Sequence, residues 1–208
     1  VFFHTKTTFP VKIIFTDFLP GMEDGVINFD YGEEIFLNFR AVSEKTNAGL
    51  SYVEFNGEFD QNLFRVITGG DGEISFKIDG TLAAGSHTLK FLNVQSEFEP
   101  YFTETTITIN VNRLPVYMDV DTEDLDLDVG ETAKVDADLY PPEAGSPTFN
   151  SSNTNVVTVD SNGNVNAVGE GEATITVSYA GTEKYAAVES VIIPVTVSKI
   201  ETDISVEE

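Results

Sequence analysis

The sequence predicts an all-β fold arranged as two tandem β-sandwiches. Three observations lead to this prediction. Apolar and polar residues alternate along short runs, turn-forming residues interrupt these runs, and the aromatic composition changes near residue 113. Alternation is the pattern of a half-buried strand, and interruptions at intervals of roughly 8–12 residues are typical of a sandwich. We find no amphipathic run long enough to predict a helix.

The clearest strands follow in order along the chain. In the first half we expect them at residues 34–40, 73–78 and 106–111, and in the second half at 125–129, 157–159 and 173–177. Turns are expected at Asn56-Gly57, at 69–72 and at 161–164, because Asn, Asp and Gly tolerate positive φ.

The two halves have different compositions. Of the 16 Phe residues, only Phe149 follows residue 113. Residues up to Arg113 carry 16 acidic and 8 basic side chains, whereas the remainder carries 19 and 3. Two different cores, and therefore two domains, are the simplest interpretation, and a chain of 208 residues is long enough for both.

The overall charge excludes several classes of protein. A formal net charge of -24 repels nucleic acid and anionic membranes, so we expect no nucleic-acid partner. No apolar run reaches the roughly 18 residues of a membrane span, so we expect no direct membrane insertion. The absence of cysteine removes disulfides, thiolate metal sites and cysteine nucleophiles.

Residues 116–198 carry a series of motifs in a fixed order. These are Leu125-x-Leu127-x-Val129-Gly130-Glu131-Thr132, Pro141, Ser151-Ser152-Asn153, Val156-Val157-Thr158-Val159-Asp160, Gly163-x-Val165 and Gly169-x-Gly171-x-Ala173-Thr174-Ile175-Thr176-Val177. In these motifs the segment resembles the bacterial Ig-like (group 2) family, found in surface adhesins such as intimins and invasins. Phe149 stands where that family usually carries Trp. The resemblance implies an immunoglobulin-like sandwich whose motif serves folding and contains no catalytic group.

Residues 10–113 resemble a second type of repeat. Tyr31-Gly32-Glu33, the segment from Leu82 to Leu89 and the late Tyr101 are similar to a group 3-like Ig-like repeat of prokaryotic adhesins. Residues 1–9 resemble the tail of an upstream module, and 200–208 the start of a following one. We therefore expect two tandem immunoglobulin-like β-sandwiches, at residues 10–113 and 114–199.

The function that these resemblances imply is a non-catalytic stalk or adhesion module of a prokaryotic, adhesin-like cell-surface protein, located outside the cell. Its expected partners are neighbouring Ig-like modules of the same chain, together with a host-cell or glycan receptor bound through a distal tip. Two alternatives stay open: a carbohydrate- or ligand-binding sandwich, and an accessory module of a secreted glycosidase.

An acidic segment at the junction is the candidate metal site. Calcium, the one candidate cofactor, prefers six to eight oxygen ligands, and Asp119, Asp121, Glu123 and Asp124 would supply carboxylates. The alternative is a solvated strand face, since Asp126 and Asp128 alternate with apolar residues.

The candidate ligand-binding residues are aromatic. Phe98, Tyr101 and Phe102, with Phe55 and Phe59, would stack on sugar faces if exposed. If they instead line the core, the spacer interpretation is favoured.

Three further features have structural explanations beside functional ones. Asn150-Ser151-Ser152 is a glycosylation sequon in a loop-rich stretch, or a chance part of the family motif. Lys12 and Asn110 are candidates for an isopeptide bond, although alternation points both outward. A catalytic triad would need His4 or His87 next to a nucleophile and a carboxylate, and nothing in the sequence suggests that arrangement, so we predict no catalytic residue.

Overall fold

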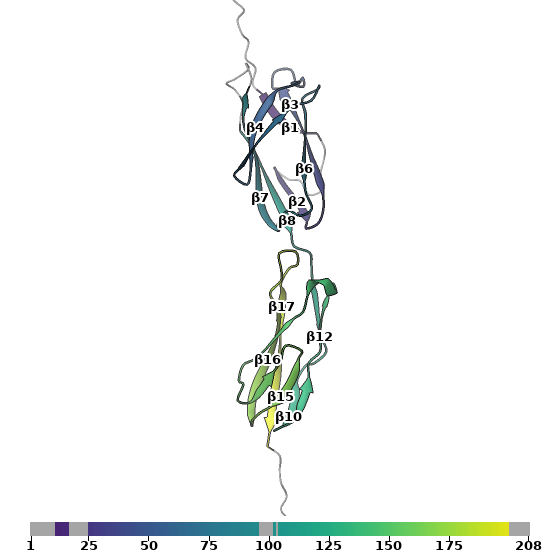
Figure 1. The fold of residues 1–208 in the computed structure, drawn as a ribbon, viewed down its shortest axis with the longest axis vertical. Helices are drawn as coiled ribbons and strands as arrows, with labels where there is room; N and C mark the ends of the chain where they lie inside the picture. Colours follow the sequence, from purple (N-terminus) through teal and green to yellow (C-terminus); the bar gives the residue numbers. More distant parts are fainter. Residues whose placement is uncertain (1–10, 17–24, 96–101, 103, 200–208) are drawn as a thin grey trace, which may run out of the picture. The chain divides into compact units, whose positions relative to one another are not determined.

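The computed structural model describes residues 11–16, 25–95, 102 and 104–199. The chain divides into two compact units, Val1–Arg113 and Leu114–Glu208. The described part of each unit is built from β-strands (Figure 1), with a short 3₁₀ turn at Pro142–Ala144. The predicted all-β fold is confirmed. Among these described residues, no helix has the length and apolar character needed to cross a membrane.

The first unit is a sandwich of two sheets. One has the strand order β1-β3-β6 and the other β2-β8-β7-β4-β5. The strands are β1 (Val11–Phe15), β2 (Val26–Asp30), β3 (Ile35–Ser43), β4 (Glu54–Phe59), β5 (Asn62–Ile67), β6 (Glu73–Ile78), β7 (Gly85–Gln95) and β8 (Thr105–Asn112).

Phenylalanine fills the core of this unit. Phe39, Phe55 and Phe91 are fully buried, and the Phe91 ring meets the other two edge-on at centroid distances of 5.3 and 6.3 Å. Edge-to-face packing suits the quadrupole of the rings. Most of the described Phe residues in the first half of the sequence therefore pack in or against the core between the sheets.

The expected turn at Asn56-Gly57 is wrong. Both residues lie inside β4, at an irregularity in its pairing with β7, and the turn to β5 is made by Asp60 and Gln61 at positive φ. A Cβ on Gly57 would lie 2.2 Å from the Cζ atom of Phe64. Gly57 is therefore required because a core ring packs against the backbone there.

The strands described in the second unit form three sheets. Their strand orders are β10-β17-β16-β13, β11-β15-β14 and β12-β9. The strands are β9 (Tyr117–Val120), β10 (Leu125–Asp128), β11 (Thr132–Lys134), β12 (Ala137–Tyr140), β13 (Thr148–Ser151), β14 (Val157–Val159), β15 (Asn164–Ala167), β16 (Gly171–Tyr179) and β17 (Val188–Ser198).

The core of this unit is aliphatic. Val135, Val157, Ile175 and Ile193 are fully buried, and Phe149 is partly buried against them. A buried tyrosine hydroxyl is also present: Tyr179 donates to the carbonyl oxygen of Ala144 at 2.7 Å. Tyr185, which precedes β17, is buried as well.

In both units an early strand runs parallel to the last strand. β2 pairs with β8 from Val26 opposite Thr108 to Asp30 opposite Asn112. β10 pairs with β17 from Leu125 opposite Val195 to Asp128 opposite Ser198. The second described strand of each unit is thus joined to the last one by a parallel ladder.

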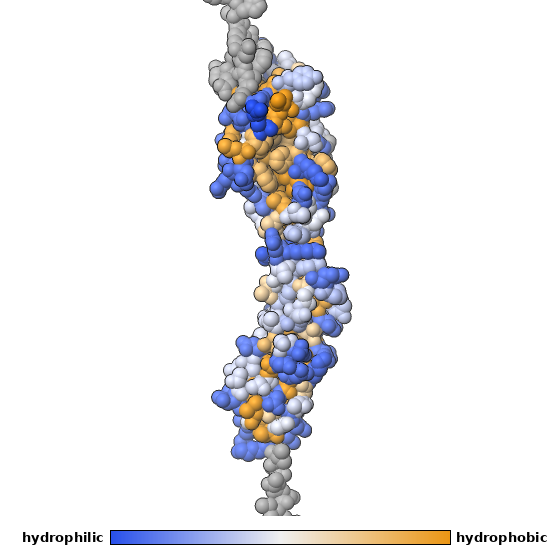
Figure 2. Space-filling view, in the orientation of Figure 1, coloured by the Kyte–Doolittle hydropathy of each residue, from blue (hydrophilic) through white to orange (hydrophobic). Residues whose placement is uncertain are grey.

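Hydrophilic side chains cover much of the visible face of each unit, with hydrophobic ones in separate patches (Figure 2). The exposed large hydrophobic residues include Phe36, Leu63 and Ile67 in the first unit and Tyr117, Tyr140 and Ile192 in the second.

Candidate functional site

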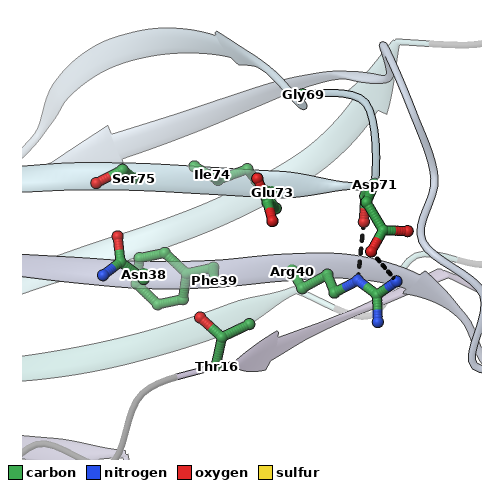
Figure 3. Close-up of a pocket in the computed structure, with 9 residues that line it drawn as sticks. All are labelled: Thr16, Asn38, Phe39, Arg40, Gly69, Asp71, Glu73, Ile74 and Ser75. Atoms are coloured by element: carbon green, nitrogen blue, oxygen red, sulfur yellow. Dashed lines mark hydrogen bonds and ion pairs between the residues drawn. The ribbon is translucent and has the colours of Figure 1, made fainter.

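An open pocket of about 740 Å³ lies on the three-stranded sheet of the first unit (Figure 3). Antiparallel register sets Arg40 opposite Glu73 and Asn38 opposite Ser75, while the alternate residues of both strands point into the core. The lining residues are Thr16, Asn38, Phe39, Arg40, Gly69, Asp71, Glu73, Ile74 and Ser75. The pocket is thus a polar depression on a sheet face.

Arg40 is held by the loop that precedes β6. Its Nε donates to the backbone oxygen of Asp71 at 2.8 Å, and its guanidinium forms an ion pair with the Asp71 carboxylate (Figure 3). The loop approaches closely because Gly49 has no side chain: a Cβ there would lie 1.9 Å from the Asp71 carbonyl oxygen. The charge of Arg40 is therefore already paired.

The pocket offers hydrogen-bonding groups rather than a reaction centre. Its side chains are a guanidinium, an amide, two hydroxyls and two carboxylates, and its lining includes no histidine. One of the carboxylates, that of Asp71, is tied to Arg40. This set of groups suits hydrogen bonding to a polar ligand in an open, solvated depression.

His87 has partners that sequence analysis missed. Its Nδ1 lies 2.5 Å from Oδ2 of Asp60, and its Nε2 lies 2.7 Å from the carbonyl oxygen of Ala83. The ring stacks on Phe59 at a centroid distance of 6.2 Å. Asp60 also accepts from the backbone N–H of Thr88 at 2.8 Å. The turn between β4 and β5 is thereby fastened to β7.

Both partners of His87 are hydrogen-bond acceptors, and this arrangement favours the imidazolium form, in which both ring nitrogens donate. Burial, the largest single influence, lowers the pKa of His87, but the hydrogen bonds to Asp60 and Ala83 and the charge of Asp60 together raise it above 6.5. A ring without a free lone pair does not act as a general base. His87 is a structural residue.

The candidate calcium ligands are not gathered into a site. Asp119, Asp121, Glu123 and Asp124 are all exposed. Within the described residues, no group of three or more His, Cys, Asp or Glu side chains could hold a metal ion. Calcium binding at these residues stays a prediction.

The aromatic candidates that are described line the core. Phe55 is fully buried, Phe59 is partly buried, and Phe102 packs against Phe55 with centroids 5.5 Å apart. Phe98 and Tyr101 lie outside the described residues. Ligand binding at Phe98, Tyr101 and Phe102 stays a prediction.

The remaining candidates are placed as follows. Asn150 is exposed in strand β13 rather than in a loop. Asn110 lies on the outer face of the five-stranded sheet, where its amide donates to Asn28 at 2.9 Å. Lys12 lies in the other sheet. Because the Asn110 side chain points away from that sheet, the structure does not support an isopeptide bond between them.

Comparison with known proteins identifies part of the chain. Residues 117–189 match the model of the bacterial Ig-like domain (group 2). No curated protein gave a significant match. The resemblance of residues 10–113 to a group 3-like repeat stays a prediction.

Several solved structures superpose on the chain. The fibronectin(III)-like modules of Clostridium thermocellum CbhA share 14% identity over 94% of this chain and 100% of theirs, with a TM-score of 0.35. Salmonella alpha-2-macroglobulin shares 9% identity over 92% of this chain but only 16% of its own, with a TM-score of 0.38. Domains 4 and 5 of the S-layer protein SbsC share 21% identity over 55% of this chain and 65% of theirs, with a TM-score of 0.29. With scores this low, the superpositions carry no argument about function.

The β-sandwich topology and the matched model point to the same conclusion. Early and late strands pair in parallel, as in immunoglobulin-like domains, and the matched segment runs from β9 into β17. These findings indicate a non-catalytic module of an extracellular protein. The second unit of this chain is a bacterial Ig-like domain of group 2.

Proposed function

We propose that this chain is a load-bearing, non-catalytic stalk segment of a prokaryotic, adhesin-like protein at the cell surface. The parallel pairing of β2 with β8 and of β10 with β17 carries this proposal. In each unit, the strand near the beginning is hydrogen-bonded to the strand at the end. Neighbouring modules of the same chain are the expected partners.

The direction of pulling explains why this pairing matters. Tension along the chain pulls β10 toward its N-terminal end and β17 toward its C-terminal end. Because the strands are parallel, this motion slides one past the other, and all bonds of the ladder are loaded together. A ladder pulled apart from one end would instead break one bond at a time. Shearing therefore requires the larger force.

The side chains support a mechanical function in a second way. All described phenylalanines of the first unit except the exposed Phe36 pack in or against its core, where they contribute cohesion, and both nitrogens of His87 serve to hold a turn. Neither arrangement favours the ligand-binding or glycosidase alternatives over the spacer.

Single-molecule pulling on the two ends of the chain tests the proposal. We expect the second unit to yield in one abrupt step. Asp126→Pro, in the middle of β10, should lower that unfolding force strongly, because proline removes a backbone donor from the sheared strand. Asn150→Pro is the control and makes the same change in β13. This strand lies at the opposite edge of the same sheet and does not belong to the sheared pair of β10 and β17. Equal loss of force in both variants, or a parent unit that yields without a force peak, would contradict the proposal.

A further inference from the structure

The outer face of β9 and β12 combines exposed tyrosines with exposed aspartates. The antiparallel register pairs Tyr117 with Tyr140 and Asp119 with Asp138. Tyr117 is 65% exposed and Tyr140 is 51% exposed, and both aspartates are exposed. Since alternate residues share a strand face, the four side chains form one surface, which we call the tyrosine–aspartate face.

The stability of the fold does not explain the aspartate half of this face, and it does not require the tyrosines to be so exposed. The apolar residues between them, Met118 and Leu139, already supply the buried contacts of this ribbon. Like charges directly opposite each other destabilise an antiparallel pair. Neither Asp119 nor Asp138 forms a salt bridge with any described lysine or arginine.

The residues that follow Asp119 and precede Asp138 show how a cation fits this surface. The backbone N–H of Asp121 points to the carbonyl oxygen of Asp136, and the Lys134 ammonium forms an ion pair with the Asp136 carboxylate. The pKa of Lys134 is raised, mainly by the hydrogen bond to Asp136 and next by the charge of Asp136. Burial lowers this pKa by less than Asp136 raises it, and the charges of Asp121 and Asp138 raise it slightly further. Elsewhere in the unit, the Lys184 ammonium lies 4.9 Å from the centroid of the Tyr185 ring.

We propose that the tyrosine–aspartate face binds an extended basic segment of a partner protein. Lysine or arginine side chains of the segment would lie over the tyrosine rings and pair with Asp119 and Asp138, combining cation–π attraction with ion pairs. The charge complementarity favours this partner over a neutral saccharide, which would also stack on the rings. The net charge of the chain, -24, would speed the encounter. The binding would add a partner to the stalk, independently of its mechanical function.

Titration of the full 208-residue chain with the peptide Gly-Arg-Gly-Arg-Gly-Arg, followed by amide NMR shifts and calorimetry, tests the inference. We expect shifts concentrated on β9 and β12. Asp119→Asn with Asp138→Asn should weaken binding about tenfold, which corresponds to two surface ion pairs of about 0.7 kcal/mol each. Tyr117→Ser with Tyr140→Ser should weaken it about fivefold through loss of the cation–π contacts.

A matched control separates a site from general attraction to a negative protein. Asp126→Asn with Asp128→Asn changes the net charge equally, at exposed positions of β10 in the same unit. This variant should bind nearly as well as the parent. An equal loss of peptide affinity in both aspartate variants, or undiminished peptide binding by the tyrosine variant, would overturn the inference. It would also be overturned if a neutral cello- or xylo-oligosaccharide shifted the amide signals of the same residues more strongly than the peptide does. Thermal melts of each variant verify that it is folded.

Discussion

At the scale of single residues, His87 links the stability of the first unit to pH. Its bonds to Asp60 and Ala83 require a protonated ring, and its pKa in the folded chain is raised above 6.5. Folding therefore favours the protonated form. The stabilisation is fully present below about pH 6.5, the pKa of an unfolded histidine, and is lost as the pH rises through the folded pKa.

Urea denaturation of parent and His87→Gln between pH 5.5 and 9 measures this effect. At pH 5.5 the variant should be less stable by about 1–2 kcal/mol, because it loses a charge-assisted hydrogen bond. The difference should shrink as the pH rises. His4 is present in both proteins, so its contribution cancels. Two curves that stay parallel across the range would show that His87 is not the linked group.

At the scale of elements, Gly57 holds a place that only glycine fits. A Cβ there would lie 2.2 Å from Cζ of Phe64 and 2.6 Å from the backbone oxygen of Lys90. Gly57→Ala should therefore destabilise the first unit by about 3 kcal/mol through overpacking. Gly69→Ala is the control: a Cβ there would lie 3.8 Å from the nearest atom, the backbone oxygen of Glu73, so the change should be nearly neutral. Chemical denaturation of both variants measures the two losses of unfolding free energy. Similar losses in the two variants would contradict the assignment of Gly57 to the strand.

The same glycine shows where prediction from sequence ends. The expected strands, such as 73–78 and 157–159, appear because alternation is a local signal of a half-buried strand. Asn56-Gly57 has an equally local turn signal, but the packing of Phe64 from the neighbouring strand overrides it. Local patterns specify strands well, and they fail where a side chain of the neighbouring strand determines the backbone conformation.

The candidate sites depend on distant pairing even more strongly. Arg40 meets Asp71 across 31 positions of the sequence, and His87 meets Asp60 across 27. Alternation shows that these side chains point outward, but it does not show which strands are neighbours or in which register. Tyr117 and Tyr140 become a pair for the same reason, through the register of β9 and β12.

At the scale of the whole molecule, the net charge of -24 predicts that stability depends on salt. Self-repulsion opposes the compact state and is screened as the Debye length shortens from about 30 Å at 0.01 M to about 8 Å at 0.15 M salt. Melting temperatures should therefore rise with NaCl. CaCl₂ at the same ionic strength should give the same rise if the candidate calcium ligands stay apart, since among the described residues no group of three or more His, Cys, Asp or Glu side chains could hold a metal ion. Extra stabilisation by CaCl₂ that disappears in Asp119→Asn with Asp121→Asn would instead establish the calcium site.

The most direct test of the load-bearing account compares two pulling directions on the second unit. Pulling the chain by its ends shears β10 against β17, whereas pulling between Glu170→Cys and the C-terminal end peels β17 away from one end, since Gly171 lies opposite Val197. The chain has no cysteine of its own, so this attachment point is unique. If the second unit bears load through this ladder, the unfolding force should be severalfold higher in the shearing direction. Equal forces in the two directions would contradict it.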